Sequence, residues 1–175
     1  LAEDDLTDCV RQVIFLMRVG HPDIEIEDRA PQQPIMAWFD RRLLSQAVTN
    51  VIKNAAEGVT AQAAIEPLAG RISISLDVTS AGLAEILITD NGKGFPKDNR
   101  NRLLEPYVTT RTEGTGLGLA IVAKILEDHG GGLELLDNPG ERGAVVRLYF
   151  PCCDGAHSTA DAAAEEMTLS DESPS

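Results

Sequence analysis

The chain has 175 residues, of which 43% are hydrophobic and 25% charged, and its formal net charge is −13. This length and composition fit one globular domain with a real core, and so acidic a chain is a poor candidate for binding nucleic acid through its phosphates. Three cysteines without framework spacing favour a reducing, cytoplasmic setting, and we expect no membrane-spanning segment or signal peptide, because no apolar run is long enough.

The beginning of the chain predicts one helix and two short strands. Apolar residues recur at helical spacing over residues 6–19, with Asp5 or Thr7 as the candidate N-cap. Alternating or β-rich sequences then predict strands at 24–27 and 35–39.

A second helix and a β-hairpin are expected next. Asp40 is a good N-cap for a helix that runs to about Glu57 or Gly58 and carries its own apolar stripe. The small residues of 59–70 read as a loop. The alternating sequence of 72–78 predicts a half-buried strand, and the more apolar 83–89 predicts a central one.

The second half of the chain predicts a long loop, a helix and another hairpin. The polar segment from Gly94 to Gly114 is long for an unstructured connection, and such loops are usually lids or binding loops. A helix is expected from about Gly116 to His129, followed by strands at 133–136 and 144–150 around an Asn-Pro-Gly turn.

Together these elements predict an α/β fold: a two-layer sandwich of a mixed, mostly antiparallel sheet with about three helices on one face. We expect the ordered domain to cover residues 1–151. The remainder, 152–175, is rich in small residues, has six acidic and no basic side chains, and is expected to be a disordered tail.

Two asparagines lie in the middle of the second predicted helix. Asn50 and Asn54 are four residues apart, so their side chains share one face, beside the apolar stripe. Asparagine is a mediocre helix former, and an amide oxygen suits the octahedral shell of Mg²⁺ beside phosphates and water. The alternative is that both are merely exposed polar residues.

A carboxylate follows the predicted central strand in the sequence DNGKG. Asp90 could accept a hydrogen bond from an exocyclic amino group such as that of adenine. Gly92 and Gly94 would let a flat ring approach the backbone closely. The alternative is a simple turn, because Asn-Gly is a common turn dipeptide.

Glycines precede the last predicted helix in the sequence GTGLGL. Gly114, Gly116 and Gly118 would leave bare amides at a helix N-terminus, which can bind phosphate, and Arg111 could reach a terminal phosphate. The glycines could instead be a flexible hinge. No Gly-Lys-Ser/Thr follows, so this is no Walker loop, and the eukaryotic-type protein-kinase motifs are missing.

The order of NVIKN, DNGKG, LEPYVTTR and GTGLGL resembles the ATP-binding catalytic domain of bacterial sensor histidine kinases, in the superfamily that includes DNA gyrase and a heat-shock chaperone. The resemblance covers roughly Leu6 to Pro151, and two stretches, RVGHPDI and YVTTRTEGTGLGLAIVAKILEDHGG, resemble nitrogen-regulation sensor kinases in particular. One departure concerns the lid, where the family usually carries Phe at the positions of Leu104 and Tyr107.

The resemblance implies a site and its ligands. It implies ATP and Mg²⁺ as cofactors, Asn54 as the metal ligand, Asp90 as the adenine reader, a mobile ATP lid over Phe95–Glu113, and Gly143 as a structural glycine. The ATP-binding residues carried over by position are Asn50, Lys53, Asn54, Asp90, Gly92, Gly94, Tyr107, Thr110, Arg111, Gly114, Thr115, Gly116, Leu117, Gly118 and Leu119.

The resemblance also implies partners. Such kinases phosphorylate a histidine on a helical dimerisation hairpin and pass the phosphate to a response regulator. No His-Glu or His-Asp pair occurs here, so we expect the hairpin to precede Leu1 and this chain not to phosphorylate itself. The isolated domain should be a cytoplasmic monomer without a nucleic-acid partner, and the intact kinase should be anchored at the inner membrane.

Other functions stay open at this point. An ATP hydrolase of the gyrase type is disfavoured, because those relatives place a Glu base where Asn50 stands. An anti-sigma-factor-like serine kinase is the main alternative within the superfamily. A non-catalytic docking module is the third, although such modules typically lose the glycine motifs.

Overall fold

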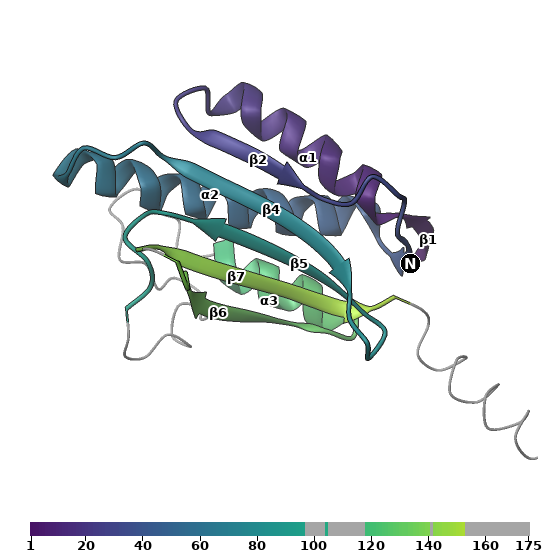
Figure 1. Cartoon of the computed structure of the whole chain (residues 1–175). Helices are drawn as coiled ribbons and strands as arrows, with labels where there is room; N and C mark the ends of the chain where they lie inside the picture. Colours follow the sequence, from purple (N-terminus) through teal and green to yellow (C-terminus); the bar gives the residue numbers. More distant parts are fainter. Residues whose placement is uncertain (97–103, 105–117, 141, 153–175) are drawn as a thin grey trace, which may run out of the picture.

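Two sheets and three helices make up the part of the chain that the computed structural model describes, namely residues 1–96, 104, 118–140 and 142–152 (Figure 1). The elements in chain order are β1 (Ala2–Asp5), α1 (Leu6–Gly20), β2 (Glu25–Arg29), β3 (Met36–Phe39), α2 (Arg41–Ile65), β4 (Arg71–Val78), β5 (Leu83–Asp90), α3 (Gly118–Asp128), β6 (Gly132–Asp137) and β7 (Ala144–Pro151).

The main sheet has five strands in the order β2-β4-β5-β7-β6. The β2–β4 pair is parallel and the other three pairs are antiparallel, while β1 and β3 form a separate antiparallel pair. Figure 1 shows the helices behind this sheet. The predicted two-layer sandwich, with a mixed, mostly antiparallel sheet, is therefore confirmed.

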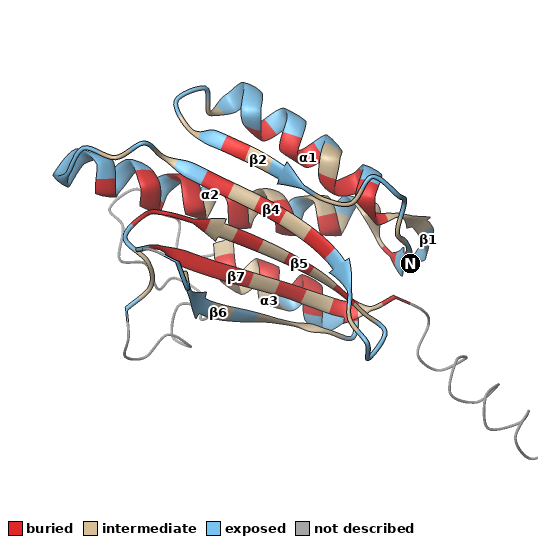
Figure 2. Cartoon of the chain, viewed as in Figure 1, coloured by how far each residue is buried: buried red, intermediate tan, exposed pale blue. Residues whose placement is uncertain are grey.

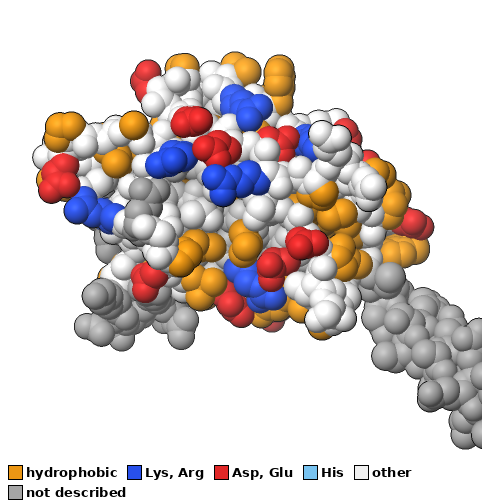
Figure 3. Space-filling model, viewed as in Figure 1, with side chains coloured by type: hydrophobic (Ala, Val, Ile, Leu, Met, Phe, Trp, Pro, Cys, Tyr) orange, Lys and Arg blue, Asp and Glu red, His pale blue; other side chains and the backbone are white. Residues whose placement is uncertain are grey.

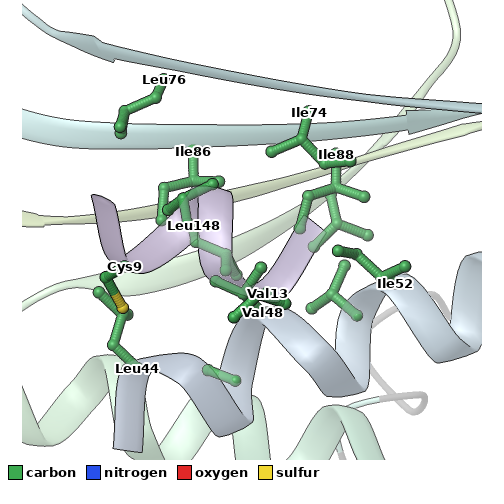
Figure 4. Close-up of a cluster of buried hydrophobic side chains, with 14 of the residues drawn as sticks. Cys9, Val13, Leu44, Val48, Ile52, Ile74, Leu76, Ile86, Ile88 and Leu148 are labelled. Carbon is green, nitrogen blue, oxygen red and sulfur yellow. The ribbon is translucent and has the colours of Figure 1, made fainter. Parts of the chain in front are cut away.

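The core lies between the sheet and the helices. Alternate residues of β4 and β5 are buried, which is the pattern of strands covered on one face (Figure 2). In Figure 4 Ile74, Ile86 and Ile88 from the sheet face Val48 and Ile52 of α2. Burying such side chains contributes roughly 1.5–3 kcal/mol each, so this layer holds the helices in place.

The opposite face of the sheet lies toward the viewer in Figure 3, where basic side chains lie beside acidic ones and hydrophobic side chains lie among them. Arg147 is the centre of one such group. Its Nε donates to Glu85 at 2.6 Å, its Nη1 to Glu134 at 3.2 Å, and its guanidinium lies 4.4 Å from the ring centre of Tyr149. The hydrogen bond to Glu85 raises the pKa of Arg147.

The helix starts follow the sequence closely. Asp5, rather than Thr7, caps α1 by accepting from the Asp8 amide at 3.1 Å. Thr7 is buried, and its hydroxyl donates to the Gln33 carbonyl and accepts from the Ile35 amide. Asp40 caps α2, accepting from the Leu43 amide at 3.1 Å, as predicted.

The end of α3 is tied to the start of α2 through His129. Its Nε2 accepts from the Asp40 amide at 3.0 Å, so the proton is on Nδ1, which donates to the Ile125 carbonyl at 2.7 Å. The buried ring also meets Phe150 edge-on, with centroids 5.8 Å apart. One imidazole therefore fixes how two helices meet.

Two expectations about elements were wrong. The helix expected to end near Gly58 continues to Ile65, because residues 59–65 contain no proline and Val59 and Gln62 are buried. The segment 59–65 is therefore helix and not loop. Strand β1 was not predicted, since its sequence AEDD has no apolar alternation; its pairing with β3 is what orders it.

Some expectations cannot be compared with the structure. Most of the lid segment and the whole of 153–175 lie outside the described residues. None of the described helices is both long and apolar enough to cross a membrane.

Candidate nucleotide site

A small pocket joins three segments that are far apart in the sequence. It lies where the middle of α2, the end of β5 with its following turn, and the start of β7 meet. Its lining consists of Val51, Asn54, Ala55, Gly58, Asp90, Gly94, Phe95, Ala144 and Val146. Three residues predicted from two separate motifs, Asn54 from one and Asp90 and Gly94 from the other, are thus brought to one place.

On the helix side of the pocket, the asparagine face of α2 meets its apolar stripe. Val51 and Ala55 are buried and line the pocket, while Asn54 lies between them along the chain and is half-buried. Asn50 is half-buried one turn earlier. Lys53 is exposed and is not among the lining residues.

The turn after β5 holds its carboxylate in a fixed place. Asp90 is 8% exposed, and its Oδ1 accepts from the Gly92 amide at 2.9 Å. Asn91 is buried and ties the turn to the start of β4: its Oδ1 accepts from the Arg71 amide and its Nδ2 donates to the Ala69 carbonyl, both at 2.9 Å. The turn is therefore anchored by side chains as well as by the strand.

Gly92 is needed for close approach to α2. A Cβ on Gly92 would lie 2.8 Å from the Gly58 carbonyl carbon and 2.9 Å from the Val59 nitrogen, both of which are backbone atoms that cannot yield cheaply. The absence of a side chain at Gly92 therefore lets the turn lie directly against the backbone of α2.

The hairpin between β6 and β7 supports the same turn from the other side. Gly94 has a φ of +78°, and a Cβ there would lie 2.9 Å from the carbonyl oxygen of Gly143. Gly143 has a φ of +137°, and a Cβ there would overlap the carbonyl oxygen of Asp90 and lie 2.9 Å from the Asn91 Cα. Gly143 is structural, as the family resemblance implied.

Asn138 adds a direct link between this hairpin and the turn. Its Nδ2 donates to the carbonyl oxygen of Asp90 at 3.0 Å, across 48 residues of sequence. Sequence reasoning treated Asn138 only as part of an Asn-Pro-Gly turn and missed this role. Its position beside Pro139 and Gly140 gave the turn but not the partner.

The phosphate side is described only in part. Gly118 is the first residue of α3, and no described atom lies within 4 Å of where its Cβ would be, while Leu119 is buried. The other predicted residues of the lid and glycine loop lie outside the described residues; they are Tyr107, Thr110, Arg111, Gly114, Thr115, Gly116 and Leu117.

The lining suits a flat, amino-bearing ring with a polar group at one edge. Val51, Ala55 and Val146 offer apolar surface, and Asp90 offers a carboxylate. The Asn54 amide oxygen belongs to the oxygen-donor class that Mg²⁺ prefers, so this side chain fits the metal that accompanies a nucleotide.

Comparison with known proteins agrees with this geometry. A model of the family described as "Histidine kinase-, DNA gyrase B-, and HSP90-like ATPase" matches residues 39–153. The chain is 55% identical over 145 residues to the nitrogen regulation protein NtrY of Azorhizobium caulinodans, which covers 82% of this chain. The chain spans only 18% of the length of that relative.

Solved structures give the same result. The mycobacterial sensor histidine kinase MprB is similar with a TM-score of 0.74 and 30% identity, covering 85% of this chain and 97% of that one. Full-length ShkA, solved in complex with AMPPNP, is similar with a TM-score of 0.69 and 30% identity, covering 86% of this chain and 31% of that one. The description of the matching family names histidine kinases, and MprB is one, which disfavours the serine-kinase and docking-module alternatives.

Proposed function

Because this chain belongs to the family of histidine kinase-, DNA gyrase B- and HSP90-like ATPases, as a sensor histidine kinase ATPase domain of the NtrY type, we propose that it holds ATP with Mg²⁺ and donates the γ-phosphate to a histidine on a separate phosphoacceptor hairpin. The observation that carries the proposal is the meeting of Asn54, Asp90 and Gly94 in one pocket. The structure of ShkA in complex with AMPPNP supports nucleotide binding by a domain of this fold.

The base side would choose adenine. The Asp90 carboxylate accepts the exocyclic amino group, which guanine does not present at that edge. The apolar lining contributed by Val51, Ala55 and Val146 covers the faces of the ring. Gly92 and Gly94 pack against the backbones of α2 and the β6–β7 hairpin, so their role is to hold the turn that carries Asp90 at the edge of the pocket.

The phosphate side would be built from α2, the lid and the start of α3. Asn54 would hold Mg²⁺, which supplies charge neutralisation for the phosphates when bound. Asn50 and Lys53 lie on the same stretch of helix, and Gly118 and Leu119 open α3, where bare amides suit an anion. We further propose that Tyr107, Thr110, Arg111, Gly114, Thr115, Gly116 and Leu117 complete this side.

Hydrolysis would be slow in this chain. Asn50 stands where hydrolysing relatives are expected to have a Glu, and an amide cannot take a proton from water. None of the three histidines is followed by an acidic residue, so none resembles the expected phosphoacceptor. The pocket would therefore keep ATP unreacted until a protein nucleophile arrives.

The partners follow from the same proposal. They are the dimerisation and phosphoacceptor hairpin of the intact kinase and, through it, the receiver domain of a response regulator. The domain itself, residues 1–151, would be a cytoplasmic monomer without nucleic-acid contacts, joined to an intact kinase anchored at the inner membrane, and 152–175 would be an acidic tail.

The test is incubation with γ-labelled ATP and Mg²⁺, first of this chain alone and then with a separately purified hairpin domain of an NtrY relative. We expect acid-labile label only on the histidine of the added hairpin. Label on this chain by itself, or fast release of phosphate without the hairpin, would contradict the proposal. A hairpin whose histidine is replaced by glutamine is the matched control.

A further inference from the structure

We propose that Asn138, in the turn between β6 and β7, is a positioning residue that sets the base selectivity of the pocket by fixing the main chain of Asp90. The inference rests on the proposed function, because it assumes that Asp90 reads the adenine amino group. It adds a residue that lies outside the motifs and is not among the residues lining the pocket.

The carboxamide of Asn138 donates one hydrogen bond and accepts another. Its Nδ2 donates to the Asp90 carbonyl oxygen at 3.0 Å, and its Oδ1 accepts from the Gly140 amide at 3.0 Å. Its own main-chain amide donates to the Gly143 carbonyl at 3.2 Å. The side chain therefore joins the tip of the β6–β7 hairpin to the end of β5.

The hydrogen bond from Asn138 lies where the pairing of β5 with β7 ends. The pairing of β5 with β7 runs from Leu83–Pro151 to Thr89–Val145, one residue short of Asp90. Gly143 then passes so close to Asp90 that it has no room for a Cβ, and the Asn138 amide bonds to the Asp90 carbonyl. The Asn138 side chain therefore binds the main chain of β5 at Asp90, one residue beyond the last pairing of β5 with β7 and at the edge of the pocket.

A fixed carbonyl means a fixed carboxylate. The Asp90 side chain has only two torsions, so its oxygens follow any rotation of its main chain, and hydrogen bonds weaken steeply when the angle is lost. Of the other links of this turn, two anchor Asn91 to the start of β4, and the Gly92 amide holds one carboxylate oxygen of Asp90; none of the three holds the Asp90 carbonyl. Loss of the hydrogen bond from Asn138 should therefore let the orientation of the Asp90 carboxylate vary, while α2 and the core stay in place.

The decisive variant is Asn138→Asp. It keeps the oxygen that accepts from Gly140 and replaces the donor that faces Asp90 with a second oxygen. We expect adenosine affinity to fall about three- to tenfold, the equivalent of one neutral hydrogen bond. The ratio of ATP to GTP affinity should fall by a similar factor. Adenosine carries no phosphate, so a fall in adenosine affinity cannot come from repulsion between phosphate groups and the added carboxylate.

Two further variants separate positioning from general loosening. Asn138→Ala removes both hydrogen bonds and should lower the same ratio. In an Asp90→Asn background, where the reader is already lost, Asn138→Asp should leave the ATP to GTP ratio unchanged. Calorimetry and urea unfolding on each variant would supply affinities and stabilities. If Asn138→Asp does not fold, the Ala variant carries the same comparison.

The outcomes are distinct from those that would sink the proposed function. If the unaltered chain does not bind ATP, the proposed function fails. If it binds ATP selectively and Asp90→Asn abolishes the selectivity, while folded Asn138 variants keep the native ATP to GTP ratio or lose both nucleotides equally, only the inference about Asn138 is overturned.

Discussion

The two sides of the site are built from different material. On the base side, main chain packs against main chain: Gly92 lies on Gly58 of α2, and Gly94 and Asp90 lie against Gly143. On the phosphate side, the described groups are a half-buried asparagine pair on α2 and Gly118, which has no described atom near its Cβ position. One side is held by the fold, and the other offers groups that a ligand could use.

The difference shows where folding and binding are coupled. A side chain added to the base side must displace backbone, so it should cost stability and affinity together. A side chain altered on the phosphate side should cost affinity alone. Substitutions at Gly143, Asp90, Asn54 and Asp40 test this contrast.

The largest effect is expected at Gly143. Gly143→Ala adds a methyl that overlaps the Asp90 carbonyl and strains a backbone with a φ of +137°. Overpacking and strain together should lower the free energy of unfolding by about 2–6 kcal/mol, measured by urea unfolding. The matched Gly118→Ala should stay within about 0.5 kcal/mol of the unaltered chain. Equal losses at the two glycines would remove the contrast.

The next effect is expected at Asp90, where binding falls more than stability. Asp90→Asn keeps the shape but sets a donor against the adenine amino group, at a cost of about 1.5–3 kcal/mol, or roughly 10- to 150-fold in ATP affinity. GTP should bind weakly to both proteins. Comparable ATP and GTP affinities in the unaltered chain, measured by calorimetry, would contradict the adenine assignment.

A smaller effect is expected on the phosphate side at Asn54. Asn54→Ala should weaken Mg·ATP binding by about tenfold, close to the worth of one hydrogen bond to a charged group. Because the loss acts through the metal, it should shrink when Mg²⁺ is omitted, and unfolding should be almost unchanged. Thr60→Ala, which alters an exposed residue further along the same helix and outside the proposed site, is the control. Equal losses with and without Mg²⁺ would show that Asn54 is no metal ligand.

The smallest effect is expected at Asp40, away from both sides. Asp40→Ala removes the N-cap of α2 and should lower stability by about 1 kcal/mol at neutral pH, with unchanged ATP affinity. The hydrogen bond from the Leu43 amide lowers the pKa of Asp40 in the folded chain. Its charge therefore stabilises the fold above the ordinary pKa of about 4, and this contribution is lost as the pH falls further.

Urea unfolding at pH 7 and pH 3 would measure this dependence. The stability gap between the unaltered chain and Asp40→Ala should be smaller at pH 3. Asp40→Asn keeps a neutral cap and should show no such narrowing. A gap that is equal at both pH values would exclude the charged cap as its source.

The sequence predicted those features that local chemistry determines. The caps at Asp5 and Asp40, the alternation in β4 and β5, and the placing of Asn54 beside an apolar stripe all follow from residues near one another in the chain. The extension of α2 to Ile65 was missed, because Gly58 looks like a helix end and the burial of Val59 and Gln62 that stabilises the last turns depends on residues distant in the chain. The Asn138–Asp90 bond was missed for the same reason, since its two partners are 48 residues apart.

The contact between Gly92 and Gly58 also has a genetic consequence. Every amino acid that one base change can put in place of a glycine carries a Cβ, and here that atom would meet the backbone of α2. No missense step from the Gly92 codon should therefore be silent in function, whatever the chemical class of the new residue. At Gly118 the methyl group of an alanine would meet no described atom, so packing among the described residues does not impose the same limit there. In a pool of random single-base variants selected for function, position 92 should keep only synonymous changes.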